Sequence, residues 1–313
     1  MRAVTIKDGE IVVDDRPDPE PGLGEVLVQV ATAGLNGADL LQVRGAYPAP
    51  PGSPADIPGL ELAGTVVGLG EGATRFGLGD KVMGIVGGGG QAELAVVHER
   101  QLSPVPSTLD IESAGGFPEV FTTAHDAVVS QAGLRPGERL LVHGAAGGVG
   151  TAAVQLASAM GASVVATSRH EGFDWRLEAL GAEVVTRPGE HAGFGPFDVV
   201  LELIGGTNLD GDVRALAPGG RIAIVGVGGG IKAELNLLAL MSVRGRIFGT
   251  TLRARPLEEK ALAARAVERE VLPLVERGQL AVPIDRTFGL DEATAAYEHF
   301  RQGGKFGKVL IAF

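Results

Sequence analysis

The sequence predicts an α/β protein in which a β-rich domain is combined with a doubly wound parallel sheet. Residues 1–115 consist of short β-branched segments punctuated by glycine and proline, which is typical of a barrel-like β domain. From residue 110 onward, helix-like and strand-like segments alternate, as in repeated βα units with right-handed crossovers. The third observation is the segment 138–162, ERLLVHGAAGGVGTAAVQLASAMGA, which has the pattern of a strand, a glycine turn and a helix.

That glycine turn has the chemistry of a diphosphate site. An apolar run, Leu140–Val142, precedes it, and residues 151–160 follow with helical spacing. Glycine lets the backbone turn tightly and lets a diphosphate approach its N–H groups, while the helix N-terminus adds unpaired donors and a positive dipole end. We predict the first βα turn of a dinucleotide fold, in which the cofactor contacts Gly144, Ala145, Gly147, Gly148, Val149 and Gly150. The alternative is a glycine-rich loop without a ligand.

The first domain is expected to contain six strands of period-two or continuous apolar character, bounded by turn residues. They lie at residues 1–7, 10–15, 25–34, 62–70, 80–86 and 92–97. The proline-rich segment Arg44–Pro58 is long for a loop, and we interpret it as either functional or a surface connection. The glycine cluster Gly87–Gly90 is interpreted as a flexible tip.

The second domain is expected to alternate more regularly. Its helices are predicted at residues 111–114, 122–132, 150–160, 174–180, 209–216 and 235–241, and its strands at 139–143, 163–168, 183–186, 197–203, 220–226 and 245–252. A long amphipathic helix is predicted at Leu257–Arg277. A strand near 281–287, a helix at 292–301 and a strand at 308–313 follow, which suggests that the tail returns to the first domain.

Composition excludes several classes of protein. The chain of 313 residues has no cysteine, so it has neither disulfides nor thiolate metal sites. Its net charge of −11, without a basic stripe, argues against nucleic acid as a partner. No apolar run reaches the length of a membrane span, and the first residues, MRAVTIKDGE, do not have the pattern of a targeting signal. We therefore expect a cytoplasmic protein that does not bind membranes.

Nine segments, taken in order, resemble one known family. They are LNGADLLQVRGAYPAPPG (35–52), GLELAGTV (59–66), GGGQAELA (88–95), FPEVFTTAHDAV (117–128), HGAAGGVGTAAVQLA (143–157), ELIGG (202–206), VGVGGG (225–230), TTLRAR (250–255) and GKVLI (307–311). The chain resembles the zinc-independent quinone oxidoreductases of the medium-chain dehydrogenase/reductase superfamily, relatives of zeta-crystallin. Within them it is most similar to the tumour-suppressor-inducible branch.

The resemblance implies both domain architecture and the absence of a catalytic metal. A GroES-like catalytic domain would span 1–118 and 278–313, and a Rossmann NADP-binding domain 119–277. In the zinc-dependent alcohol dehydrogenases a cysteine opens the motif that here begins with Asn36, and a histidine ligand stands where this chain has Leu60. Leucine cannot bind zinc and asparagine is a poor ligand. The six histidines are scattered without ligand spacing, so we expect no metal.

Without a Lewis acid, hydride transfer depends on orientation and polarisation. The resemblance places Asn36 and Tyr47 in the substrate pocket. Asn36 would donate an N–H to a carbonyl oxygen that gains negative charge, and Tyr47 would stack on the ring or donate its O–H. Asp39 is expected to orient Asn36 or its loop. The alternatives are that Asn36 only satisfies backbone groups at a turn and that Tyr47 only packs the loop.

The residues after the second Rossmann strand favour NADPH. NAD selectivity usually needs a carboxylate about 20 residues past the glycine turn. This chain instead has Ser168 and Arg169, which can donate to a 2′-phosphate, and Arg187 is a second candidate. The alternative is that Arg169 is a solvated surface arginine. The resemblance adds further cofactor contacts at Gly205, Gly226, Gly228 and Lys308.

The sequence therefore predicts an NADPH-dependent quinone oxidoreductase, which transfers a hydride or single electrons to a small quinone-like substrate. One rival is a zinc-free reductase of enones or 2-enoyl thioesters. Another is an NADPH-binding redox sensor with little turnover.

A homodimer is also expected. The strand predicted at 245–252 is the last of the nucleotide sheet, carries Ile247, Phe248 and Leu252, and has no proline to protect it. Pairing of this edge, near Ile247–Leu252, with the same strand of a second copy would cover it. The alternative is a monomer whose edge is hidden by the helix at 257–277.

Overall fold

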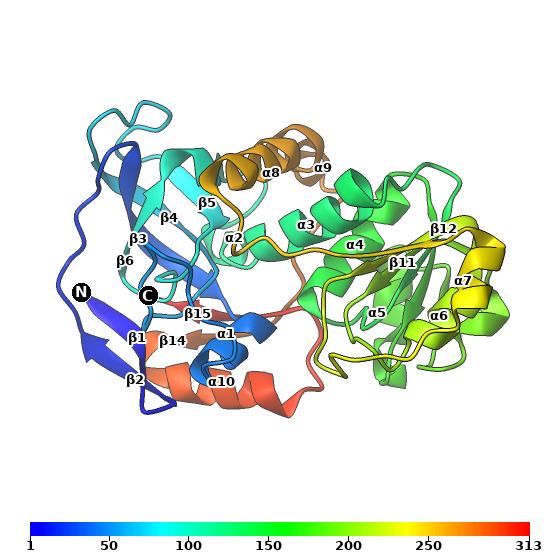
Figure 1. Cartoon of the computed structure of the whole chain (residues 1–313). Coiled ribbons are helices and arrows are strands. Elements are labelled where there is room, and N and C mark those ends of the chain that lie inside the picture. Colours follow the sequence, from blue (N-terminus) through cyan, green and yellow to red (C-terminus); the bar gives the residue numbers. More distant parts are fainter. The chain divides into compact units, whose positions relative to one another are not determined.

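The structure is a computed structural model that describes residues 1–313 and divides into two compact units (Figure 1). One unit is formed by Met1–Glu119 and Leu252–Phe313, and the other by Val120–Thr251. The predicted α/β class is confirmed, and the first unit is discontinuous as expected.

A seven-stranded sheet forms the centre of the first unit. Its strand order is β14-β15-β3-β4-β5-β7, with β6 paired to β3, and all pairs except β14–β15 are antiparallel. The strands are β3 (Glu25–Gly34), β4 (Glu61–Leu69), β5 (Lys81–Ile85), β6 (Leu94–His98), β7 (Leu102–Pro104), β14 (Ile284–Gly289) and β15 (Lys308–Ala312). Strands β1 (Arg2–Lys7) and β2 (Glu10–Asp15) form a separate hairpin.

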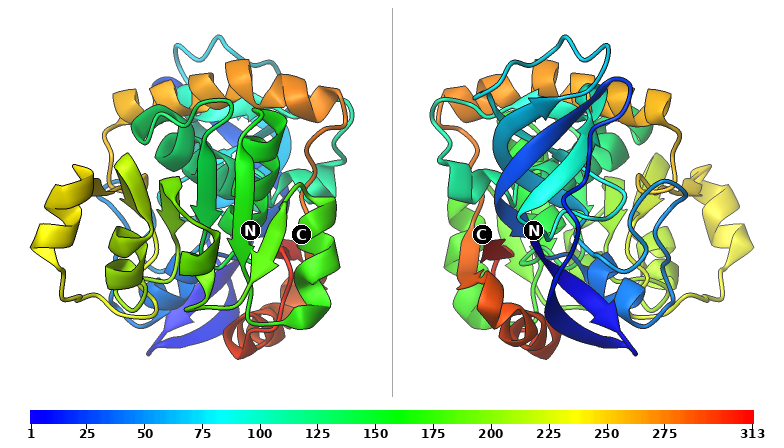
Figure 2. Two further views of the ribbon diagram at one scale, coloured as in Figure 1. Left: turned by 90° about the vertical axis from the view of Figure 1, so that its right-hand side faces the viewer. Right: turned by 90° about the vertical axis from the view of Figure 1, so that its left-hand side faces the viewer.

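The helices of the first unit are short except near the C-terminus. They are α1 (Gly37–Val43), α2 (Ile111–Ala114), α8 (Leu257–Glu270), α9 (Leu272–Glu276) and α10 (Ala293–Gln302), with 3₁₀ turns at Glu99–Gln101 and Leu290–Glu292. Helix α10 packs beside the β1–β2 hairpin (Figure 2), where Tyr297 lies in a core with Val4 and Ile311. The first and last thirds of the sequence therefore share one core.

The division between the units falls earlier in the sequence than the predicted boundary at residues 277/278. Residues 252–277 belong to the first unit because α8 is tied to the loops of the β domain. Arg100 forms an ion pair with Glu258 at 2.6 Å, and Arg75 pairs with Glu268 at 2.7 Å. The predicted single helix at 257–277 is also divided, because Pro273, the second residue of α9, cannot donate a hydrogen bond to the preceding turn.

The second unit has a parallel sheet of six strands, in the order β10-β9-β8-β11-β12-β13. Its strands are β8 (Arg139–Val142), β9 (Ser163–Thr167), β10 (Val184–Thr186), β11 (Phe197–Glu202), β12 (Leu216–Ile224) and β13 (Arg246–Gly249). The order reverses between β8 and β11. In open α/β sheets, ligands bind beyond the carboxyl ends of the strands at such a switch point. The glycine turn follows β8 and therefore lies there.

Two helical segments precede β8, and further helices lie between the parallel strands. They are α3 (Pro118–Ala124), a π-helix at His125–Gln131, α4 (Gly148–Ala159), α5 (Asp174–Ala179), α6 (Leu209–Arg214) and α7 (Leu237–Val243), with 3₁₀ turns at Glu171–Phe173 and His191–Phe194. The predicted helix at 122–132 is thus helical but of two types. The predicted strand at 245–252 ends at Gly249, and Leu252 belongs to the first unit.

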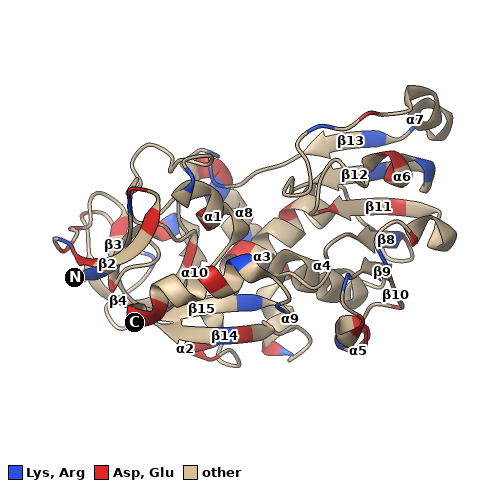
Figure 3. Ribbon diagram, turned by 90° about the horizontal axis from the view of Figure 1, so that it is seen from below, with Lys and Arg blue, Asp and Glu red and all other residues tan.

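None of the helices combines the length and apolar character needed to cross a bilayer. Basic and acidic positions are interspersed along the ribbon in the view of Figure 3.

Arg221 on β12 is a buried charge that links several segments of the second unit. Its guanidinium donates to the carbonyl oxygens of Ala132, Gly133 and Asp198 and forms a bidentate pair with Glu138.

Arg221→Met is expected to destabilise the protein by roughly 3 kcal/mol, because it leaves a carboxylate and several carbonyls without donors. Urea unfolding measures this loss. Arg214→Met, which removes an exposed ion pair on α6, is the control and should change stability little. Equal effects of the two variants would contradict this role of Arg221.

Candidate active site

The glycine turn between β8 and α4 is shaped by close backbone contacts. Gly144 has φ +66°, a conformation that favours glycine, and its N–H donates to Thr167 Oγ1 at 3.3 Å. A Cβ on Gly150 would lie 2.6 Å from both the Cα of Ala145 and the carbonyl oxygen of Gly144. Helix α4 therefore rests directly on the turn, and Ala145, which is fully buried, occupies the position of the first fingerprint glycine.

This turn fits a dinucleotide diphosphate. Helix α4 is twelve residues long and begins after Gly147, so the N–H groups of Gly148 and Val149 have no acceptor within the helix. The surrounding residues, 146–149, are only partly buried. Free donors and a positive helix end at a switch point form an anion site. The structure thus brings together all six residues predicted for the turn.

The three residues predicted to bind the 2′-phosphate differ in how many hydrogen bonds and ion pairs their side chains already make. The Ser168 hydroxyl donates to the carbonyl oxygen of His170 at 3.1 Å and accepts from its N–H, so its proton is already used in a local turn. Arg187 is paired with Asp174 and donates to the Ser168 carbonyl oxygen at 3.0 Å. Arg169 is exposed and makes no ion pair. Of the three residues, Arg169 is therefore the one whose side chain remains available to bind the 2′-phosphate.

The predicted glycines beyond β11 and β12 serve backbone packing. A Cβ on Gly205, where φ is +120°, would lie 2.6 Å from the Gly230 carbonyl oxygen, and one on Gly226 would lie 2.1 Å from the Leu203 carbonyl oxygen. Gly228 meets nothing within 4 Å. The first two glycines are therefore required by the fold itself, whether or not a cofactor contacts them.

In the first unit, Asn36 is part of a buried ion-pair network. Lys308 lies 2.6 Å from Glu61 Oε1 and donates to Asn36 Oδ1 and to the Leu35 carbonyl oxygen. The Asn36 amide donates to Glu61 Oε1 at 3.0 Å and to the Gly34 carbonyl oxygen at 3.2 Å. Both amide hydrogens are thus occupied, which contradicts the prediction that Asn36 donates to a substrate carbonyl.

The same network corrects the prediction for Lys308. Its ammonium has three donors, and three acceptors within the first unit take them. Lys308 is 2% exposed, so it retains no donor for a cofactor. Its role in this structure is to neutralise Glu61.

Asp39 accepts hydrogen bonds from the main chain on either side of the Asn36 network. Its carboxylate accepts from the Asn36 N–H at 2.8 Å, as part of the capping box that begins α1, and from the Gly59 N–H at 3.1 Å. Burial raises the pKa of Asp39 to about 6, although these two N–H groups and the charge of Lys308 oppose the shift.

Tyr47 is held by a buried arginine that the sequence did not single out. Arg253 donates to the carbonyl oxygens of Tyr47 and Gly87, both at 2.8 Å, and to Gln42 Oε1 at 2.5 Å. Its guanidinium also lies 5.0 Å from the centre of the Tyr47 ring. Burial lowers the pKa of Arg253. The long loop 44–58 and the glycine cluster 87–90 are therefore joined through one side chain.

Glu119 is a further titratable residue beside these charges. Its N–H donates to Glu61 Oε2 at 2.8 Å. Burial, reinforced by the neighbouring Glu61 carboxylate, raises the pKa of Glu119 to about 8, against the attraction of Lys308 and Arg253. Glu119 thus keeps its proton at neutral pH.

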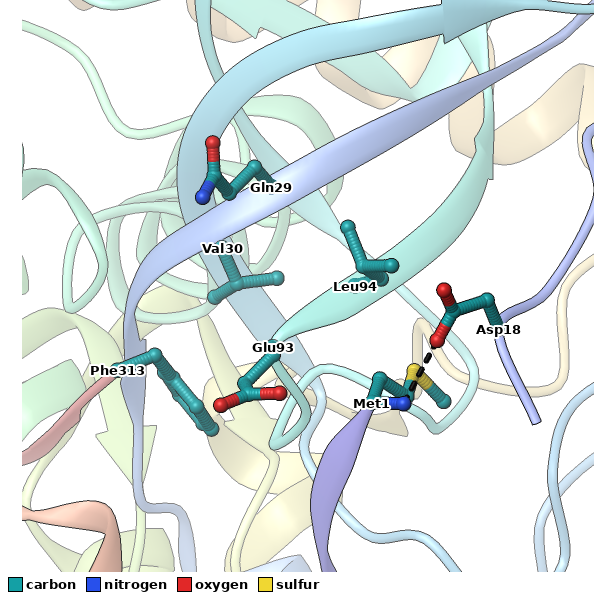
Figure 4. Close-up of a pocket in the computed structure, with 7 residues that line it drawn as sticks. All are labelled: Met1, Asp18, Gln29, Val30, Glu93, Leu94 and Phe313. Atoms are coloured by element: carbon teal, nitrogen blue, oxygen red, sulfur yellow. Dashed lines mark hydrogen bonds and ion pairs between the residues drawn. The ribbon is translucent and has the colours of Figure 1, made fainter. Parts of the chain in front are cut away.

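A pocket of about 470 Å³ elsewhere in the first unit contains none of the predicted site residues (Figure 4). It is lined in part by the first and last residues of the chain, Met1 and Phe313, with Asp18 and Glu93. The Met1 ammonium pairs with Asp18 at 2.6 Å. The pocket thus lies where the two ends of the chain come together. None of the residues predicted to bind substrate or cofactor lines it.

Comparisons with known proteins match both units. A model of the alcohol dehydrogenase GroES-like domain matches residues 22–107, and one of zinc-binding dehydrogenases matches residues 160–311. The human quinone oxidoreductase is 31% identical over 327 residues, which cover 99% of this chain and 97% of that protein. The chain belongs to the quinone oxidoreductase family of the medium-chain dehydrogenase/reductase superfamily.

Two further proteins extend the likeness. An alcohol dehydrogenase superfamily protein from Novosphingobium aromaticivorans superposes with a TM-score of 0.89 at 30% identity, covering 100% of this chain and 99% of that one. Polyketide synthase GfsB of Streptomyces halstedii is 36% identical over 294 residues, which are 92% of this chain but only 5% of that protein. The GroES-like and Rossmann domains are confirmed, and membership implies a nicotinamide cofactor and an oxidoreductase of the quinone or enoyl reductase type.

Sequence reasoning missed three charged residues of the first unit: Glu61, Glu119 and Arg253. All three lie inside segments that carried the family resemblance. A charged residue in an otherwise apolar run, as in GLELAGTV and FPEVF, was the available signal for two of them, because charges are buried only when they are paired.

Gly150→Ala is expected to weaken binding of the nicotinamide cofactor and to destabilise the second unit, because its Cβ would overlap backbone atoms that cannot move independently. Cofactor titration and thermal unfolding measure the two effects. Gly193→Ala is the matched control, since Gly193 is exposed in the same unit and its Cβ would meet nothing within 4 Å. A Gly150→Ala variant with native affinity and stability would mean that the turn does not have this geometry.

Glu119→Gln is expected to become more stable relative to the native protein as pH rises. The unfolded carboxyl titrates near 4.5 and the folded one near 8, so the folded state binds more protons in this window and loses stability as pH rises through it. Glutamine does not titrate. Urea unfolding at several pH values measures the difference, with Glu112→Gln, an exposed glutamate of α2, as control. A stability difference that stays constant between about pH 5 and pH 8 would contradict the raised pKa.

Proposed function

We propose that the protein is an NADPH-dependent quinone oxidoreductase that works without a catalytic zinc ion. The proposal is supported chiefly by end-to-end similarity to the human quinone oxidoreductase. It is supported further by the residues at the two positions where zinc-dependent relatives carry ligands. Leu60 is an apolar core residue, 2% exposed, and Asn36 is committed to Glu61 and Lys308.

The cofactor would supply the hydride, and the residues of this chain would bind and orient it. The donors of Gly148 and Val149 at the start of α4 would hold the diphosphate. Arg169 would bind the 2′-phosphate. In the first unit, Arg253 fixes the backbone at Tyr47, whose ring is the remaining candidate for contact with a quinone. The Asn36–Glu61–Lys308 network keeps the start of α1 in place.

A reductase of 2-enoyl thioesters is the second candidate. It is favoured by the 36% identity to polyketide synthase GfsB, because reduction of such double bonds belongs to the chemistry of acyl-chain assembly. An NADPH-binding sensor with little turnover is the remaining alternative.

Steady-state oxidation of NADPH separates these functions. We expect rapid oxidation with 1,2-naphthoquinone, slower oxidation with a 2-enoyl thioester, and no increase in rate when Zn²⁺ is added. A higher kcat/KM with the thioester would transfer the proposal to the second candidate. Tight NADPH binding in a direct titration, without turnover of either substrate, would favour the sensor. A rise in kcat on addition of Zn²⁺, without a rise in the thermal unfolding midpoint, would refute the zinc-free mechanism.

Arg169→Ala is expected to weaken binding of NADPH by roughly 1.5–3 kcal/mol and to leave NADH binding nearly unchanged, because only NADPH has a phosphate for this guanidinium. Fluorescence titration with both cofactors measures the change. Arg214→Ala removes one exposed positive charge elsewhere in the second unit and is the control. Equal weakening of both cofactors would remove Arg169 from the phosphate site.

We also propose that the protein forms a homodimer through β13. This strand is at the edge of its sheet, and Ile247 and Phe248 are half-buried on it. The neighbouring helix α7 carries no charged residue (Figure 3) and exposes Leu237, Leu238 and Met241. An open edge beside exposed apolar side chains is a surface that a second copy would cover.

Light scattering tests the dimer. A mass of about 64 kDa, twice the 32.0 kDa of the chain, is expected at micromolar concentration. Phe248→Lys should shift the population to monomer, whereas Leu262→Lys, at an exposed apolar position of α8, should not. A native monomer, or a dimer that survives Phe248→Lys, would contradict this interface.

A further inference from the structure

Three polar side chains from distant parts of the sequence meet inside the second unit. His143 follows β8, His191 lies on the 3₁₀ turn His191–Phe194, and Asp212 is on α6. They are 0%, 3% and 0% exposed. The two imidazole rings are 4.9 Å apart and nearly perpendicular, and the possible ligand atoms of all three residues lie within 4.8 Å of one another.

The hydrogen bonds of this cluster are incomplete. His143 Nε2 lies 2.7 Å from Asp212 Oδ1, and His191 Nε2 lies 3.3 Å from the same oxygen. Neither ring nitrogen of His191 has a hydrogen-bond partner, and neither does Asp212 Oδ2. Buried polar atoms are rarely left in this state, and an ion at the site is one of the few explanations.

The ligand chemistry is that of a borderline divalent metal. His143 Nδ1 lies 3.2 Å from Thr167 Oγ1, a contact that can fix the ring and leave Nε2 as the ligand atom. The buried charge of Asp212 also needs a positive counterpart. Two imidazole nitrogens and one carboxylate oxygen suit Zn²⁺, Co²⁺ or Ni²⁺.

Two further residues border the cluster. A Cβ on Gly211 would lie 3.3 Å from two atoms of the His191 ring, so the glycine lets the ring approach α6 closely. Glu202 Oε2 is 4.0 Å from His143 Nε2 and offers a fourth oxygen near the cluster. Glu202 also accepts from the Gly205 N–H and from Asn208 Nδ2, so a ligand from it would be firmly positioned.

We propose that His143, His191 and Asp212 bind one divalent ion of the zinc class as a structural site of the second unit. The ion would join β8, the turn at His191 and α6 directly behind the glycine turn. This site is separate from the positions of Asn36 and Leu60, where zinc-dependent relatives carry their catalytic ligands. It takes no part in the proposed reaction, so its test is independent of that function.

Metal binding by the full chain tests the proposal without an activity assay. The protein is stripped of metal by dialysis against a chelator and titrated with Co²⁺ and then Zn²⁺. We expect visible d–d absorption that saturates at about one Co²⁺ per chain and disappears when Zn²⁺ displaces the Co²⁺. Binding of either ion should also raise the thermal unfolding midpoint by several degrees. Native protein that shows neither the absorption nor the thermal shift would overturn the proposal and leave a hydrogen-bonded His143–Asp212 pair only.

Variants assign the ion to these residues. His191→Ala and Asp212→Asn should each lose the cobalt absorption and the thermal shift. His98→Ala, at a histidine of β6 in the other unit, should keep both. If the two cluster variants retain native cobalt binding, the ion lies elsewhere and the proposal fails. If either variant does not fold, the cobalt titration of the native protein together with the other variant decides.

Discussion

The buried ion pair between Glu61 and Lys308 is the contact on which the first unit depends. It joins β4 to β15 across most of the length of the sequence and lies at 2.6 Å with almost no exposure. Two charges removed from water need complete partners, because loss of one leaves the other unpaired in a medium of low dielectric constant. Asn36, the Leu35 carbonyl and the Glu119 N–H supply those partners. The start of α1 and the start of α3 are therefore held by the same pair.

The second unit reaches its organisation by a different route. Here the critical contact is between backbones, where Gly150 of α4 meets Ala145 of the turn without room for a Cβ. This approach directs the free N–H groups of the first helical turn toward the place where the strand order reverses. The proposed cofactor site is thus built from main-chain atoms, whereas the predicted substrate site is built from charged side chains that mostly bind one another.

The difference explains which site residues were predictable. The glycine turn could be predicted because its chemistry follows from local backbone geometry, which depends on consecutive residues. Asn36 and Lys308 were assigned to substrate and cofactor because of the family resemblance, yet their donors are used within the unit. Whether a donor is free depends on which side chain lies opposite, and here the partners are 25 and more residues away. Arg253 escaped notice for the same reason.

The sequence by itself determined the alternation of strands and helices, the position of the glycine turn and the membership of the tail in the first domain. These follow from hydrophobic periodicity and from turn residues, which act over a few positions. Only the tertiary structure decided that residues 252–277 join the first unit, because Arg75 and Arg100 pair with α8 across long sequence separations. It also brought His143, His191 and Asp212 together. The strand order of the sheet brings the elements that carry these three residues close together. The spacing of the residues along the sequence does not indicate that they are close.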